Sequence, residues 1–154
     1  MEVMCQHKRL LKRLNAELKP WRTYTIAVDG RNYSGKSSMA RFLAWQLGMP
    51  ALETDMFLVR GSQPARYEYD QLKKLIETRH SKNWPVIIEG IKILETLELL
   101  QVRPDFLIFM KNTGVEATGG LSSQITVYLQ KYCPELKAHF VFEWNASGDA
   151  LSGS

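Results

Sequence analysis

Residues 30–37 read GRNYSGKS and match the pattern G-x-x-x-x-G-K-[ST], with both glycines, the lysine and the final hydroxyl in place. The preceding segment, residues 23–29 (TYTIAVD), is β-branched and apolar, which is typical of a buried strand. Residues 38–47 have helical spacing, and Gly48 and Pro50 end that helix. A strand, a glycine-containing loop and a helix in this order are the context that the pattern requires, so residues 30–37 are predicted to bind phosphate.

The chemistry of this loop, here called the P-loop (residues 30–37), follows from its backbone. Successive N–H groups in such a loop form an anion-binding concavity, and the following helix adds the positive end of its dipole. We expect Lys36 to reach the β- and γ-phosphates and the Ser37 hydroxyl to bind Mg²⁺. The predicted nucleotide-binding residues are Gly30, Arg31, Asn32, Tyr33, Ser34, Gly35, Lys36, Ser37 and Ser38.

Two carboxylates follow short apolar segments and are candidates for the same site. Glu89 ends the buried run PVII (residues 85–88), so we expect it at the carboxyl edge of the sheet, where it could help to hold Mg²⁺. Asp55 follows a predicted strand at residues 51–54 and could accept the proton of an acceptor hydroxyl. Glu53 is a lesser candidate if that strand extends to Asp55. A solvated strand-end or loop carboxylate is the alternative for each.

Strands and helices alternate along the rest of the chain. Further helices are predicted at residues 67–80, 91–100 and 122–132, and further strands at residues 86–88, 105–110 and 139–144. This alternation predicts right-handed crossovers and a parallel sheet covered on both faces, the three-layer α/β architecture.

The composition is that of a soluble globular domain, with 154 residues, 45% hydrophobic and 23% charged. We expect one domain over residues 1–144 and a disordered tail over residues 145–154. The net charge of +4 resides in residues 1–22, which hold six Lys or Arg against two Glu. Leucines at helical spacing predict an amphipathic helix over residues 1–20 that packs on the core and exposes its lysines. Contact of this basic helix with nucleic acid or a membrane is the less favoured alternative.

Several protein classes are excluded by the same sequence. No apolar run approaches the about 20 residues that span a bilayer, so no membrane partner is expected. The amino terminus lacks the separate apolar core of a secretion signal. Cys5 and Cys133 have neither zinc-ligand spacing nor the density of a disulfide scaffold, so we expect a cytoplasmic location and no metal other than Mg²⁺.

Three stretches, VDG (residues 28–30), DMF (residues 55–57) and IIEG (residues 87–90), together resemble the uridine kinase family, to which the nicotinamide riboside kinases belong. The resemblance covers roughly residues 23–110. It implies a P-loop NTPase fold with a five-stranded parallel sheet of order 2-3-1-4-5, and transfer of the ATP γ-phosphate to a ribosyl hydroxyl. By resemblance, Lys36 would bind phosphates, Ser37 and Glu89 would organise Mg²⁺, and Asp55 would be the catalytic base.

The chain departs from that family in two ways that bear on function. Tyr33 stands where the family usually has a small glycine, and residues 111–143 contain no arginine where the family has an arginine-rich lid. Lysine does not reproduce the bidentate arginine fork. Arg60 and Arg66 could substitute from the acceptor side, or they could be solvated loop residues.

Two functional hypotheses therefore stand. The first is an ATP-dependent small-molecule kinase that phosphorylates a hydroxyl of a nucleoside or a similar metabolite. The second is a nucleotide-binding module or switch without efficient phosphoryl transfer. The acceptor, and the choice between ATP and GTP, are open at this point.

Overall fold

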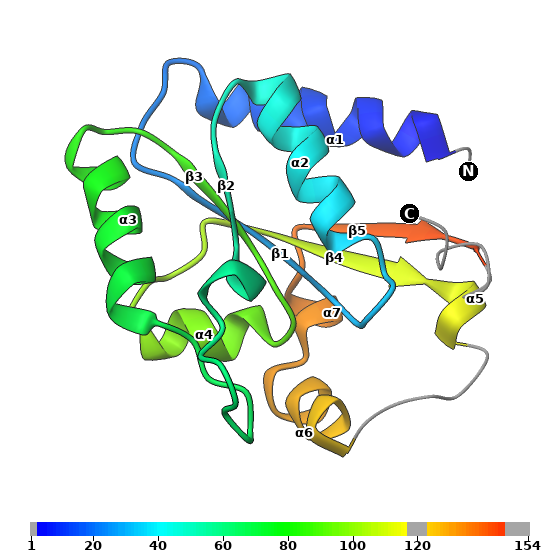
Figure 1. Ribbon diagram of the computed structural model, residues 1–154. Coiled ribbons are helices and arrows are strands. Elements are labelled where there is room, and N and C mark those ends of the chain that lie inside the picture. Colours follow the sequence, from blue (N-terminus) through cyan, green and yellow to red (C-terminus); the bar gives the residue numbers. More distant parts are fainter. Residues whose placement is uncertain (1–2, 117–122, 147–154) are drawn as a thin grey trace.

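The computed structural model describes residues 3–116 and 123–146, and its centre is a five-stranded sheet (Figure 1). The strand order is β2-β3-β1-β4-β5, and all neighbouring strands are parallel. The strands are β1 (Thr25–Gly30), β2 (Ala51–Glu53), β3 (Val86–Glu89), β4 (Phe106–Asn112) and β5 (Phe140–Trp144). The expected order and the three-layer architecture are confirmed. The predicted disorder of the carboxyl-terminal tail concerns residues that, from 147 on, lie outside the described ones.

The helices cover both faces of this sheet (Figure 1). They are α1 (Val3–Leu18), α2 (Lys36–Leu47), α3 (Tyr69–Ser81), α4 (Ile93–Leu99), α5 (Thr113–Glu116), α6 (Ser123–Tyr132) and α7 (Pro134–Lys137), with one 3-10 turn, η1 (Thr54–Phe57). Every residue of the central strands β1 and β3 is buried, because helices exclude water from both faces. Among the described residues, no helix is both long enough and apolar enough to cross a membrane.

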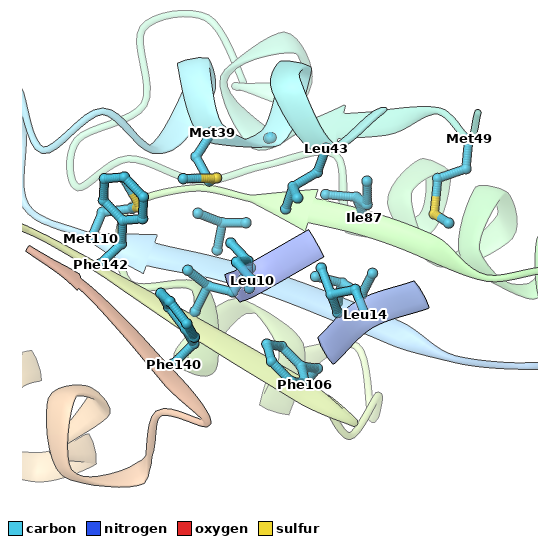
Figure 2. Close-up of a cluster of buried hydrophobic side chains, with 14 of the residues drawn as sticks. Leu10, Leu14, Met39, Leu43, Met49, Ile87, Phe106, Met110, Phe140 and Phe142 are labelled. Carbon is cyan, nitrogen blue, oxygen red and sulfur yellow. The ribbon is translucent and has the colours of Figure 1, made fainter. Parts of the chain in front are cut away.

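Helices α1 and α2 share one face of the sheet. Leu10, Leu14 and Leu18 of α1 are at most 1% exposed and join a core with α2 and the central strands. Figure 2 shows Leu10 and Leu14 gathered with Leu43 of α2 and with Phe106 and Phe140 of the strands. Helix α1 therefore buries its leucines on the core, and its four central basic residues, Lys8, Arg9, Lys12 and Arg13, are exposed.

Helix α1 also covers the outer edge of the sheet. The amide of Gln6, which is buried, donates to the carbonyl of Glu143 at 2.7 Å and accepts from the N–H of Glu143 at 3.0 Å. Arg13 donates to the carbonyl of His139 at 2.5 Å. These side chains satisfy backbone groups of β5 and of the residue before it, which would otherwise be open for pairing with another chain.

The other face carries a second core, formed mainly by α3 and α4 against β1, β3 and β4. Helix α7 contacts β4 on the same side, and α6 contacts α4. The short helices α5 and α7 were not predicted, because four residues are too few for a periodic pattern to be read. Pro134 starts α7 at a position where its missing N–H costs nothing.

Some predicted boundaries are shifted by one or two residues. Strand β1 begins at Thr25, where pairing with Val86 begins, and not at residue 23. Helix α2 begins at Lys36 and not at residue 38, so the last two residues of the P-loop form its first turn. Strand β2 ends at Glu53, and the chain then turns into η1. The last shift decides where Asp55 lies.

Candidate functional site

The P-loop connects the carboxyl end of β1 to the first turn of α2 (Figure 1). Gly30 has φ +152°, and a Cβ there would lie 2.4 Å from Ser34 Oγ and 2.7 Å from the carbonyl of Met110. Gly35 has φ +89°, in the region that L residues rarely adopt. Both glycines of the motif are therefore required by the backbone path and by the close approach of β4.

The last three backbone N–H groups of the P-loop are available for hydrogen bonding to a ligand. Within the described part of the chain, no group accepts a hydrogen bond from the N–H of Gly35, Lys36 or Ser37. These donors lie at the amino end of α2, where a helix leaves its first N–H groups unsatisfied and carries a partial positive charge. The loop thus has the arrangement that binds phosphate oxygens.

The side chain of Lys36 folds back onto the backbone of the P-loop. Its Nζ donates to the carbonyl of Arg31 at 2.8 Å. Burial lowers the pKa of Lys36 from its ordinary value, and the carboxylates of Glu89, Asp29 and Asp55 oppose that shift. A phosphate near Lys36 would favour its charged form further, because opposite charges attract strongly in a partly desolvated site.

Ser37, the last residue of the P-loop, forms a hydrogen bond with Glu89. The Ser37 hydroxyl donates to Glu89 Oε1 at 3.0 Å, and Glu89, at the carboxyl end of β3, is buried. Burial raises the pKa of Glu89, the Ser37 hydrogen bond and Lys36 oppose the shift, and Asp55 adds to it. The sequence predicted both residues separately, and the parallel register of β1 with β3 brings them together.

A hydroxyl and one carboxylate fit Mg²⁺, which prefers oxygen ligands. Mg²⁺ in phosphate-binding sites keeps several waters and takes one or two protein ligands together with phosphate oxygens. Among residues 3–116 and 123–146, no group of three or more His, Cys, Asp or Glu could hold a metal ion. The donor set of Ser37 and Glu89 is therefore suited to Mg²⁺ bound with a nucleotide and not to a metal held by protein alone.

Asp55 lies in η1, just beyond the carboxyl end of β2, and its side chain is exposed. It is close enough to influence the pKa of both Lys36 and Glu89. An exposed carboxylate at this edge of the sheet is accessible to a hydroxyl-bearing molecule. Strand β2 ends at Glu53 and does not extend to Asp55. Glu53 is paired in register with Glu89 and adds to the raised pKa of that residue, but its own carboxylate accepts a hydrogen bond from Arg41 Nε at 2.5 Å.

The two arginines proposed for the acceptor side lie on the loop after η1. An antiparallel bridge between Leu58 and Tyr67 closes this loop, and the N–H of Val59 donates to the carbonyl of Arg66 at 2.8 Å. Arg60 and Arg66 are both exposed. The structure therefore places both arginines on an exposed loop that follows η1.

The region expected to form a lid is described in part, over residues 111–116 and 123–143. Lys111 Nζ forms an ion pair with Glu135 at 2.8 Å. Lys131 Nζ lies 5.1 Å from the centre of the Tyr132 ring. These two lysines already have partners of their own within the fold.

Sequence reasoning missed a buried hydrogen bond at the residue that precedes the P-loop. Asp29, the last residue before Gly30, accepts the N–H of Gly30 at 2.8 Å and the hydroxyl of Tyr128, which comes from α6. The N–H of Leu94 in α4 donates to the same hydroxyl at 3.2 Å. Burial raises the pKa of Asp29 to about 6, and the Tyr128 and Gly30 hydrogen bonds oppose that shift.

The raised pKa of Asp29 makes stability depend on pH. Because Asp29 binds a proton more tightly in the folded chain than its ordinary pKa of 3.8 implies, the free energy of unfolding is expected to fall as pH rises from about 4 to about 6. The titration of Asp29 changes the free energy of unfolding by at most roughly 3 kcal/mol over this pH range. Asp29→Asn should remove this pH dependence. Tyr128→Phe should move the fall in the free energy of unfolding to higher pH, because it removes a hydrogen bond that lowers the pKa of Asp29. Urea unfolding of the three proteins from pH 4 to 8 checks this, and parallel curves for wild type and Asp29→Asn would contradict it.

Two further residues that sequence reasoning missed contact the P-loop carbonyls. Asn112, at the end of β4, donates to the carbonyl of Tyr33 at 3.0 Å. Trp144, at the end of β5, donates through its indole N–H to the carbonyl of Ser34 at 2.8 Å. Asn112 follows an apolar strand, as Glu89 does, so the same positional signal could have identified it. Tyr33 itself has φ +60° and is 66% exposed.

Comparison with solved structures gives a clear likeness to a kinase structure. It is to the structure of a possible uridine kinase from Bacillus stearothermophilus, with a TM-score of 0.64 and 16% identity, over 92% of this chain and 100% of that one. A shikimate kinase from Bacteroides thetaiotaomicron matches with a TM-score of 0.39 and 16% identity, over 78% of this chain and 85% of that one. A thymidylate kinase from Ehrlichia chaffeensis matches with a TM-score of 0.41 and 11% identity, over 82% and 90%.

No protein-family model and no curated protein matches the chain. At 16% identity, the likeness to the possible uridine kinase concerns the fold and leaves the substrate open. The parallel sheet of order β2-β3-β1-β4-β5, with a phosphate-binding loop after β1, agrees with it. The expected resemblance thus holds at the level of architecture, and the chain has the P-loop NTPase fold.

Proposed function

We propose that this protein is an ATP-dependent small-molecule kinase that transfers the γ-phosphate to a hydroxyl of a nucleoside or a similar metabolite. The observation that carries the proposal is the hydrogen bond from Ser37 to Glu89 at the end of the P-loop, where the N–H groups of Gly35, Lys36 and Ser37 have no acceptor within the described chain. Lys36 and Asp55 are close to this pair. A phosphate site, a Mg²⁺ donor set and an accessible carboxylate are the parts that phosphoryl transfer to a hydroxyl needs.

Phosphate binding, Mg²⁺ binding and proton acceptance fall to different residues of the site. The N–H groups of residues 34–37 bind the β- and γ-phosphate oxygens, and Lys36 exchanges the carbonyl of Arg31 for a phosphate oxygen. Ser37 and Glu89 hold Mg²⁺, which neutralises phosphate charge when bound. Asp55 orients the acceptor hydroxyl and takes its proton. Most of the rate enhancement comes from positioning and charge neutralisation. A cytoplasmic location is part of the proposal.

A nucleotide-binding module without efficient transfer is the second candidate. It is favoured by the absence of arginine from residues 111–143 and by the partners that Lys111 and Lys131 already have. Charge on the transferring group would then be neutralised by Lys36 and Mg²⁺ with little further support. An arginine that reaches the transferring phosphate can contribute roughly 10³- to 10⁵-fold in rate, so its lack is a specific reason for slow turnover.

ADP release from Mg·ATP separates the two candidates. We expect release to depend on a pooled panel of nucleosides and related hydroxyl-bearing metabolites, and to be lost in Lys36→Ala. Division of the pool would then identify the acceptor. Saturable binding of Mg·ATP with no acceptor-dependent release from the whole panel would favour the binding module, and a chain that binds no nucleotide would contradict both.

A further inference from the structure

Two side chains that lie far from the P-loop in the sequence donate hydrogen bonds to its backbone carbonyls. The carbonyl of Tyr33 accepts a hydrogen bond from Asn112, and the carbonyl of Ser34 accepts one from Trp144. These two side chains come from the carboxyl ends of β4 and β5. Consecutive carbonyls of the loop are thus tied to the two strands that lie on one side of β1 in the sheet.

Asn112 uses both ends of its amide. While Nδ2 donates to Tyr33, Oδ1 accepts the N–H of Gly114 at 3.2 Å and the N–H of Ala146 at 3.0 Å. The side chain is buried. An aspartate could accept but not donate, and a leucine could do neither, so the amide suits this position chemically. It connects the P-loop with the start of α5 and with the chain after β5.

Trp144 supports the loop by shape as well as by its N–H. A Cβ built on Gly35 would lie 3.2 Å from Cζ2 of the Trp144 ring, so the ring packs directly against the glycine before Lys36. The indole N–H to Ser34 carbonyl distance is 2.8 Å. Indole offers one donor and no acceptor, which matches a carbonyl oxygen.

The direction of these carbonyls determines where the N–H groups point. In a peptide unit the N–H and C=O are antiparallel, so a carbonyl fixed toward β4 and β5 directs the N–H of the next residue to the opposite side. The peptide N–H groups after Tyr33 and Ser34 belong to Ser34 and Gly35. The N–H of Gly35 has no acceptor in the described chain, and that of Ser34 makes a 3.2 Å contact with the carbonyl of Arg31.

We propose that Asn112 and Trp144 are positioning residues, which hold the P-loop carbonyls away from the phosphates and so keep the loop in its anion-binding form before nucleotide arrives. The inference rests on the proposed nucleotide binding but assigns a role outside the sequence motif. Preorganised donors need no rearrangement on binding, so their support strengthens both affinity and catalysis.

The test compares three variants with wild type. Trp144→Phe removes the indole N–H and keeps an aromatic ring beside Gly35. Trp45→Phe makes the same substitution on α2, where Trp45 is 77% exposed. Thr113→Val removes a hydrogen bond to the carbonyl of Trp144 at 3.2 Å and leaves both P-loop contacts in place.

Titration calorimetry with Mg²⁺ and inorganic tripolyphosphate measures the affinity of the P-loop for phosphate groups, with no nucleobase and no acceptor present. We expect Trp144→Phe to bind about ten-fold more weakly than wild type, and both control variants to stay within about two-fold, because a P-loop carbonyl loses its donor in Trp144→Phe alone. In turnover assays, the KM for Mg·ATP should rise by a similar factor while the KM for the acceptor is unchanged. A residue with a purely structural role would not separate the two KM values.

The outcomes distinguish this inference from the proposed function. If wild type binds tripolyphosphate and Trp144→Phe binds it equally well, the positioning role is overturned and the proposed function stands. If wild type binds none, the proposed function fails and the inference with it. If thermal unfolding shows that Trp144→Phe does not fold, Asn112→Ser, which removes the donor to Tyr33, replaces it in the same titration with the same expected loss.

Discussion

Lys36→Ala is expected to lower kcat/KM for acceptor phosphorylation by roughly 10²- to 10³-fold, the range measured when one donor to a developing negative charge is removed. Lys36 is the cation of the P-loop, and its Nζ contacts the backbone carbonyl of Arg31 at 2.8 Å, a contact that it can exchange for one with a phosphate oxygen. Steady-state ADP release with saturating acceptor measures the loss. Binding of Mg·ATP should weaken in parallel, because the same contact exists in the ground state.

The control for Lys36→Ala is Lys8→Ala, which removes one positive charge from an exposed position on α1. Its kinetic constants should stay within about two-fold of wild type. Lys36→Arg tests geometry, since guanidinium is bulkier and planar while ammonium is a compact point charge. Full activity in Lys36→Ala would show that the P-loop lysine takes no part in transfer, and the kinase proposal would then lack its main cation.

Asp55→Asn should lower kcat by roughly 10²- to 10⁴-fold, the usual contribution of a general base, while the Kd for Mg·ATP changes less than about two-fold. The amide keeps the shape of the side chain but cannot take a proton at neutral pH. Asp55 is exposed in η1, so the fold has little reason to change. Rapid-quench measurement of the first turnover, together with equilibrium binding of Mg·ATP, separates the chemical step from affinity.

Glu53→Gln is the matched control for Asp55→Asn. It makes the same change from carboxylate to amide two residues away, at a side chain bound to Arg41. We expect kcat near the wild-type value and at most a small loss of stability, because the Arg41 side chain of this ion pair is 69% exposed, and a pair at the surface contributes about 0–1 kcal/mol. Equal kcat in Asp55→Asn and wild type would exclude the general-base role and direct attention to another acceptor of the proton.

Local sequence patterns predicted the parts of the site that depend on chain direction. Strand, loop and helix around residues 30–37 follow from β-branched residues, glycines and helical spacing, which act over a few neighbours. Glu89 and Asp55 were identified because parallel strands present their carboxyl ends at one edge. The order of the strands came from family resemblance, since periodicity alone does not say which strands pair. The structure then placed Ser37 and Glu89 within hydrogen-bond distance.

The sequence by itself determined the P-loop, the alternation of strands and helices, and the carboxylates at the strand ends, because each of these depends on residues that are adjacent in the chain. Only the tertiary structure decided that Asn112, Trp144 and Tyr128 support that loop. Their partners lie 79, 110 and 99 residues away in the sequence. Such contacts arise from strand order and helix packing, which bring distant side chains to one edge of the sheet, and no local pattern records them.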